Sequence, residues 1–332
     1  MFTSYCVVLS LLWIALYDTL ATPMLTSLAV YSIRVRNVVE HESETLSSIL
    51  GEEDLLGILK TYFDELRAET PDNESTQIIL RVLKCGVEGR NLMGMIETGA
   101  YGIESVLINR KTKVEVLKRT PDVADMFPFF FLFHVPDGTD EGILILQRRG
   151  HYGIRSILHF LLKLKFEDEF PDLRLHIIPQ ILEKDFKRLL HGLATRIRYC
   201  QYKPSSDITD NATGGHEEKF GSVELVFKAK RGIFFDLRDK LGKIIRGQSA
   251  NSVFELEDFD FDFQKVKVDL IQPNGRPRQV DLNNLKNARS YHDITDELDE
   301  MKKSPNDFDA LKELAEELLL ETRRQLYGRA GE

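Results

Sequence analysis

The sequence predicts an α+β protein of two domains, in which mixed or antiparallel sheets carry flanking helices. Three observations support this prediction. The chain has 332 residues, more than the about 100–200 residues of a typical domain. Hydrophobic residues make up 42% of it, enough for a substantial core. Short apolar runs bounded by turn residues are interspersed with segments of helical periodicity, without an internal repeat.

Residues 1–23 differ from the rest of the chain. An apolar stretch runs from Cys6 to Tyr17, which is shorter than the roughly 20 residues that span a bilayer. No Lys or Arg precedes Arg34, so the positive region of a signal peptide is absent. We interpret residues 1–23 as a leader before a true start at Met24, with a signal peptide or anchor as the alternative.

The first domain is expected at 24–204 and opens with a strand at 28–36. Apolar residues at near-helical spacing predict a helix over about 44–68, divided at Gly51. Gly99 and Gly102 supply the backbone freedom for a hairpin loop between two of the strands that follow. The expected strands are 78–85, then 92–97 and 104–108 as that hairpin, and 114–118.

A core hairpin is predicted in the middle of this domain. The run from Phe127 to Val135 is too apolar for anything but a strand buried on both faces, and the run from Ile143 to Arg148 returns beside it. We expect Phe129, Phe131 and Ile145 to be fully buried, together with Ile143. The remaining elements are a helix at 155–164, a strand at 173–178, a helix at 183–192 and a strand at 195–202.

A stretch rich in Ser, Asp, Thr and Gly at 205–221 is the expected linker. The second domain then covers 222–332 and ends in an amphipathic helix at 307–326. Asn274-Gly275, flanked by β-forming residues, predicts a hairpin turn. The other expected elements are strands at 222–230, 264–271 and 277–282 and a helix at 234–246.

The chain carries none of the common catalytic signatures. A nucleophile elbow, a P-loop, a dinucleotide fingerprint and a His-Glu-x-x-His helix are all absent. Its cysteines, Cys6, Cys85 and Cys200, are odd in number and lack metal-ligand spacing, which is typical of buried thiols in the reducing cytoplasm. We therefore expect a cytoplasmic protein without a cofactor and without enzymatic activity.

A metal-dependent nuclease-like enzyme is one alternative. It would use His151 or His159 with the acids of the core-hairpin turn, which are Asp137, Asp140 and Glu141. A carboxylate metal site at Asp258, Asp260 and Asp262 is a weaker hypothesis, because these residues alternate with Phe as on an ordinary strand.

Positive charge is concentrated in the segment 148–203. This segment holds twelve Lys or Arg against six Asp or Glu, whereas the whole chain has a net charge of -9. Arginines on a strand with aromatic neighbours suit phosphate contact and base stacking. The predicted nucleic-acid-binding residues are Arg148, Arg149, Arg155, Lys187, Arg188, Arg196 and Arg198.

Three blocks of the sequence follow one another in a recognisable order. They are the opening strand 31–37, the run 127–133 with its partner 142–146 and the following 150–153, and the strand 221–230. The order of these blocks resembles that of the RexA family of phage exclusion proteins. The resemblance implies a two-domain DNA-binding protein that self-associates and acts with a membrane effector. It carries no residue motif from which individual site residues follow.

These observations lead us to expect a non-enzymatic, nucleic-acid-binding sensor or effector of a phage-exclusion or abortive-infection system. Its expected partners are nucleic acid, a membrane effector protein and a second copy in a homodimer. The second alternative is a protein–protein interaction scaffold that uses the acidic helices at 44–68 and 307–326.

Overall fold

The computed structural model describes residues 25–69, 72–73, 77–150, 152–182, 184–185, 191–202, 223–256, 263–271, 277–287 and 291–328. They form two compact units: unit 1 runs up to Ile178 and resumes at Tyr291, and unit 2 runs from Pro179 to Ser290. The predicted domain ranges of 24–204 and 222–332 therefore differ from the observed division, and the predicted linker lies outside the described residues. The reason is strand pairing, because β11 (Leu193–Gln201) joins the sheet of unit 2 while the C-terminal segment returns to unit 1.

Unit 1 is built on a sheet of nine described strands. The main path of the sheet is β10-β1-β8-β7-β4-β3-β2, with β15 pairing beside β1 and β9 beside β8. The neighbours from β1 to β2 along this path are antiparallel. The strands are β1 (Thr26–Asn37), β2 (Asp72–Asn73), β3 (Ile78–Glu88), β4 (Asn91–Ala100), β7 (Asp125–His134), β8 (Gly142–Arg149), β9 (Tyr152–Gly153), β10 (Leu173–Pro179) and β15 (Tyr291–Asp293).

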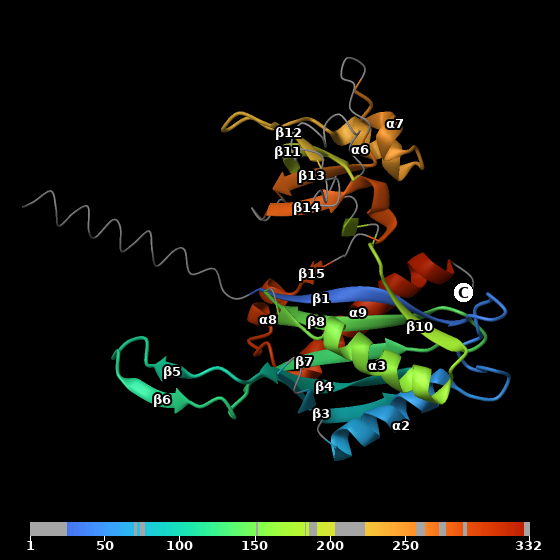
Figure 1. Cartoon of the computed structure of the whole chain (residues 1–332), viewed down its shortest axis with the longest axis vertical. Coiled ribbons are helices and arrows are strands. Elements are labelled where there is room, and N and C mark those ends of the chain that lie inside the picture. Colours follow the sequence, from blue (N-terminus) through green and yellow to red (C-terminus); the bar gives the residue numbers. More distant parts are fainter. Residues whose placement is uncertain are drawn as a thin grey trace, which may run out of the picture. The chain divides into compact units, whose positions relative to one another are not determined.

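Helices cover both faces of this sheet (Figure 1). α2 (Leu55–Ala68) and α3 (Arg155–Glu169) pack on one face, where Phe63 stacks on Phe131 with ring centroids 4.6 Å apart. α9 (Phe308–Tyr327) lies on the other face, where the rings of Phe308 and Phe130 are 5.6 Å apart. Successive residues of β7 point to opposite faces, so both faces need apolar side chains. This explains the unbroken apolar run of the strand.

The predicted core hairpin is confirmed. β7 pairs with β8, and the side chains of Phe129, Phe131, Ile143 and Ile145 are all buried. The α+β class with antiparallel sheets is also as predicted. Among the described residues, no helix is both long and apolar enough to cross a lipid bilayer.

The helix predicted over 44–68 begins only at Leu55. Leu50 and Gly51 both have positive φ, of 50° and 84°, so the chain turns sharply there. Asp54 then caps α2 by accepting a hydrogen bond from the Leu56 amide at 3.0 Å. The apolar spacing before Gly51 reflects buried loop residues such as Leu46 rather than helix.

The predicted hairpin of 92–97 with 104–108 is wrong. β4 pairs with β3 on one side and β7 on the other, and Gly99 lies inside this strand rather than in a loop. A Cβ at Gly99 would be 2.2 Å from the Asp125 carbonyl oxygen, so glycine permits the close approach of β7. The segment 104–108 pairs instead with the next strand, so that β5 (Ser105–Ile108) and β6 (Glu115–Arg119) form a separate two-stranded sheet.

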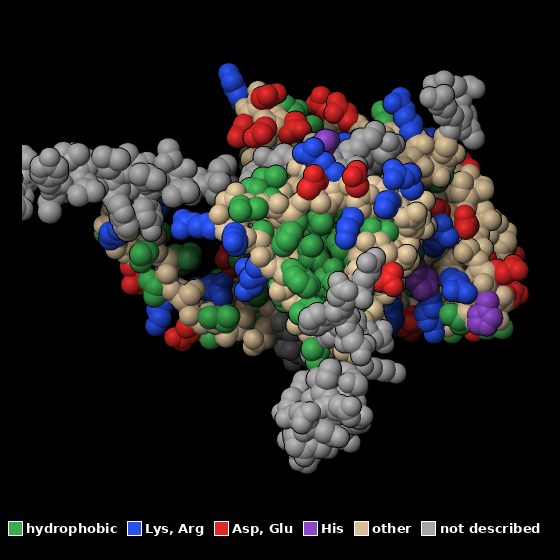
Figure 2. Space-filling view, turned by 90° about the horizontal axis from the view of Figure 1, so that it is seen from above, with side chains coloured by type: hydrophobic (Ala, Val, Ile, Leu, Met, Phe, Trp, Pro, Cys, Tyr) green, Lys and Arg blue, Asp and Glu red, His purple; other side chains and the backbone are tan. Residues whose placement is uncertain are grey.

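This two-stranded sheet projects from unit 1, and we call residues 103–119 the arm (Figure 1). Nearly all of its side chains are exposed, including those of Val114 and Val116 at 62% and 67%. Apolar and positively charged side chains both show on its surface, at the left of the molecule in Figure 2. An exposed apolar hairpin is unusual, because isolated two-stranded sheets are only marginally stable in water.

Unit 2 is built on four described antiparallel strands in the order β12-β11-β13-β14. Alternation along the strands puts Ile197 and Val268 toward a core that includes Leu241 of α6, whereas the other face of the sheet is polar. The remaining elements are β12 (Val223–Lys228), α6 (Arg238–Ile245), α7 (Ala250–Val253), β13 (Lys265–Ile271), β14 (Pro277–Asp281) and η2 (Leu282–Asn287). Most of the predicted helix at 183–192 and the turn at Asn274-Gly275 lie outside the described residues.

Candidate nucleic-acid-binding surface

Three of the predicted binding residues belong to unit 1, and each is held by a contact within the unit. The Arg148 guanidinium lies 4.1 Å from the centre of the Tyr291 ring. Arg149 donates a 3.0 Å hydrogen bond to the side-chain oxygen of Asn306. Arg155, on α3, donates to the Ile177 carbonyl at 3.1 Å. These contacts hold the three arginines against unit 1 and leave less of each side chain for a ligand.

Arg196 and Arg198 lie in unit 2, on the polar face of β11 as predicted. Two carboxylates accompany them. Arg198 bonds Asp269 at 2.9 Å and approaches Glu224 at 3.5 Å, while Arg196 is 3.8 Å from Asp269. Burial opposes ionisation of Asp269, but hydrogen bonds from Arg198 and Gln279 outweigh it and hold its pKa below the usual value. The positive charge of this pair is therefore largely balanced locally.

The seven predicted residues are thus divided. Arg148, Arg149 and Arg155 lie in unit 1, and Arg196 and Arg198 lie in unit 2. Lys187 and Arg188 lie outside the described residues. Every described member of the set makes an intramolecular polar or cation–π contact.

A different part of unit 2 carries a denser positive charge, and we call residues 228–246 the basic segment. It holds seven cations against two acids in 19 residues. All seven are exposed, and none has an ion pair within the described part of the chain. They are Lys228, Lys230, Arg231, Arg238, Lys240, Lys243 and Arg246.

The local sequence explains how the basic segment displays its charge. α6 buries Leu241 and Ile244 in the core of unit 2, whereas its cations Arg238, Lys240 and Lys243 are exposed to water. Before the helix, the amide of Ile233 donates to the Lys230 carbonyl at 2.9 Å, and Gly232 has a φ of 79° that closes this turn. Phe235 then ties the loop down by a 2.9 Å hydrogen bond from its amide to the Ala194 carbonyl.

Aromatic and aliphatic side chains accompany the cations. Ile233 is 60% exposed and Phe234 is 39% exposed. The next residue, Phe235, packs against the core of unit 2. Phe227, at the end of β12, is also exposed. Exposed rings beside cations can stack on bases while the cations contact phosphates. The basic segment therefore combines the two features that single-stranded nucleic acid requires.

Charge counting could have found the basic segment in the sequence. Its excess of five positive charges falls within 19 residues, whereas the excess of six in 148–203 is spread over three times that length. From the sequence, 222–246 was interpreted only as a strand and a helix, and the high density of positive charge in this segment was therefore missed. The exposure of Phe227 and Phe234 could not be read from the sequence, because both belong to an apolar pattern typical of core.

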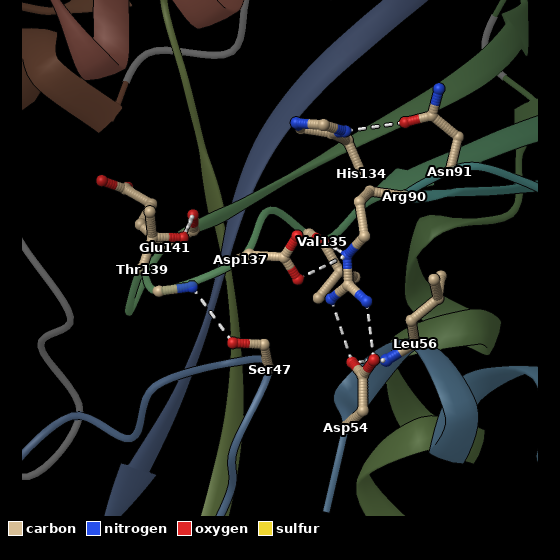
Figure 3. A network of polar contacts seen from close by, with 11 residues as sticks. Ser47, Asp54, Leu56, Arg90, Asn91, His134, Val135, Asp137, Thr139 and Glu141 are labelled. Atoms are coloured by element: carbon tan, nitrogen blue, oxygen red, sulfur yellow. Dashed lines mark hydrogen bonds and ion pairs between the residues drawn. The ribbon is translucent and has the colours of Figure 1, made fainter. Parts of the chain in front are cut away.

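Two of the three acids of the enzymatic alternative, Asp137 and Glu141, have structural partners (Figure 3). Arg90 forms a two-pronged pair with Asp54 at 2.6 and 3.1 Å, and it also lies 3.2 Å from Asp137. Glu141 pairs with Arg34 at 2.9 Å. These contacts tie the β7–β8 turn to the start of α2 and to β1.

The histidines do not join these acids in the described part of the chain. His159 lies on α3, where burial lowers its pKa and a hydrogen bond links it to the backbone of Leu175. His151 lies outside the described residues, as do Asp258, Asp260 and Asp262. Among described residues, no three His, Cys, Asp or Glu side chains gather as metal ligands would.

No protein-family model matches the sequence, and no curated protein shows significant similarity to it.

Proposed function

We propose that this protein binds nucleic acid without enzymatic turnover, through the basic segment of unit 2. The observation that carries the proposal is the set of seven exposed cations without ion-pair partners among the described residues. Such cations replace condensed counterions on a phosphate backbone, and the released counterions drive binding. The contact is with the backbone, so the proposed binding has little sequence preference.

Single strands are the proposed preferred ligand. Phe227 and Phe234 expose ring surface beside the cations. Base stacking on such rings contributes about 1–3 kcal/mol per base, and paired bases in a duplex are not free to make it. The same oligonucleotide should therefore bind more tightly as a single strand than as a duplex.

The biological setting proposed here is phage exclusion or abortive infection in the cytoplasm, with a membrane effector as partner. The support for this part is the resemblance of three sequence blocks to the RexA family. A neighbouring gene for a multi-spanning membrane protein would strengthen it, and a loss of phage resistance on deleting the gene would test it in cells.

Fluorescence anisotropy with a labelled single strand of about 20 nucleotides, titrated at several salt concentrations, tests the binding proposal. The double variant Lys230→Ala, Arg231→Ala should weaken binding and lower the salt slope by about 0.7 for each phosphate that the variant no longer neutralises. Phe234→Ala should weaken binding with little change of slope, because stacking releases no counterions.

Two further double variants make the test specific. Arg196→Ala, Arg198→Ala removes the pair predicted from the sequence, and a smaller loss of affinity than for Lys230 and Arg231 is expected because carboxylates already balance it. Arg323→Ala, Arg324→Ala removes two exposed cations of α9 in unit 1 and should leave binding unchanged. Absent binding at low salt, or equal losses of affinity in all three double variants, would refute the proposal.

A further inference from the structure

The arm is an apolar surface on both of its faces. Opposed residues of an antiparallel pair point to the same face, so Leu107 and Leu117 share one face, while Val106 lies on the other. The exposed aliphatic residues of the arm are Ile103, Val106, Leu107, Ile108, Val114, Val116 and Leu117. They are divided between the two faces of the arm, so each face presents aliphatic side chains to water.

The arm keeps its shape through its own hydrogen bonds. At its tip the Asn109 side chain accepts from the amides of Lys111 and Thr112 at 2.9 and 3.0 Å. The amide of Asn109 donates to the Val114 carbonyl at 2.8 Å, and Arg119 donates to the Ile103 carbonyl at its base. The surface is thus preformed, which lowers the entropy cost of docking.

The arm is also positively charged. It holds five cations against two acids, and in the described part of the chain Arg110, Lys111, Lys113 and Lys118 have no ion pair. A surface of this kind fits an acidic partner surface with some apolar character.

Unit 1 itself presents such a surface. α8 (Thr295–Glu300) and α9 lie in the segment 295–327, which holds ten acids against five cations. Asp309, Glu313 and Glu317 follow one another at i, i+4 spacing along the exposed stripe of α9. Leu320, on the same stripe, is 55% exposed. We call this surface the acidic face.

We infer that the arm of one copy docks on the acidic face of a second copy, and that the two copies form a two-fold symmetric dimer. In such a dimer each arm meets the partner's acidic face, so the contact is made twice. A standard interface buries about 800 Å² on each partner, and in this dimer each copy contributes both its arm and its acidic face to the buried area. The inference uses neither the basic segment nor unit 2, so it stands apart from the proposed nucleic-acid binding.

Charge reversal in both surfaces tests the inference with the full chain in sedimentation experiments without nucleic acid. The wild type at roughly 50 μM, a concentration sufficient for interfaces of this size, should have twice the chain mass of 38.2 kDa. The arm variant Arg110→Glu, Lys111→Glu, Lys113→Glu should be monomeric. The face variant Glu313→Lys, Glu317→Lys should be monomeric too.

An equimolar mixture of the two variants provides the decisive measurement. Each negative arm then meets a positive face and each positive arm meets a negative face, so the mixture should recover the dimer mass. Val116→Asp should also give a monomer, because it places a charge in the apolar surface. Val39→Asp, at an exposed valine of unit 1 outside both surfaces, should remain a dimer.

Circular dichroism and melting temperature check that every variant folds, which is expected because all the changed side chains are exposed. A monomeric wild type, two dimeric reversal variants, or a mixture that stays monomeric would each overturn the inference. So would an arm variant that keeps the dimer mass but no longer binds single strands, since the arm would then contact nucleic acid. Failure of the proposed function is a separate result, namely absent oligonucleotide binding with the dimer intact.

Discussion

Replacing Phe131 by alanine tests whether the two-faced sheet of unit 1 is its main source of stability. Phe131 is fully buried near the middle of β7. Its ring stacks on Phe63 of α2 at 4.6 Å and meets the edge of Phe133 at 6.0 Å. Opposite it on β4 is Gly94, which has no side chain that could fill the space left by a smaller residue.

The expected loss of stability follows from these contacts. Truncation of a buried phenylalanine costs about 3–5 kcal/mol through transfer energy and the remaining cavity. The two aromatic contacts contribute about 0.5–1.5 kcal/mol each beyond area. Because Gly94 cannot fill the cavity, we expect a value in the upper half of the 3–5 kcal/mol range. That is a large fraction of the about 5–15 kcal/mol that stabilises a typical domain.

Urea unfolding followed by circular dichroism measures this loss of stability. Phe160→Ala on α3 is the matched control, because that ring is 44% exposed and its removal should cost less than about 1 kcal/mol. If Phe131→Ala also loses less than about 1 kcal/mol, the apolar run of β7 is not a packed core and the layered architecture described above is incorrect.

Three further predictions concern unit 1. Gly94→Ala should destabilise by roughly 1–3 kcal/mol or more, since its Cβ would lie 2.0 Å from the Lys84 carbonyl oxygen, while Gly86→Ala, with nothing within 4 Å, should change the unfolding free energy by less than about 0.5 kcal/mol. Burial lowers the pKa of His134 to about 4, so the native state resists protonation of this side chain. The free energy of unfolding should therefore fall by up to about 3 kcal/mol as the pH drops from 6.5 to 4. The variant His134→Gln should remove this part of the pH dependence in urea titrations. Asp54→Ala should cost about 1–2 kcal/mol in thermal unfolding, because it removes the cap of α2.

Positions of strands and helices followed from the sequence where the apolar pattern was strong. β7 and β8 read as strands because runs such as 127–135 have no polar face, and α9 reads as a helix because its leucines recur at helical spacing. The prediction of a helix before α2 was wrong for a physical reason. Leu46 and Ile49 have the spacing of a helix face, but positive φ at Leu50 and Gly51 turns the chain instead.

Pairing between strands that lie far apart in the chain could not be predicted from the local sequence pattern. β1 and β8 are neighbours although more than 100 residues separate them, and β15 pairs with β1 from the far end of the chain. An apolar stripe on α9 shows that one side is buried but does not say against which sheet, so its return to unit 1 was not predicted. The polar network of Arg90 and Asp54 was missed for the same reason, because each residue alone reads as part of a turn.

The net charge of this chain is a poor guide to what it binds. Salt limits the reach of an exposed charge to about 8 Å at physiological ionic strength, so a ligand at the basic segment responds mainly to charges beside it. The exposed Glu42 and Glu52 of unit 1 test this reasoning. Glu42→Lys, Glu52→Lys moves the net charge of the chain from -9 to -5 and should leave the salt slope of single-strand binding unchanged. Lys230→Ala, Arg231→Ala makes the chain only two charges more acidic yet should lower that slope, since it removes cations that neutralise phosphates. A slope that follows net charge in both variants would mean that long-range attraction, rather than the basic segment, drives the binding.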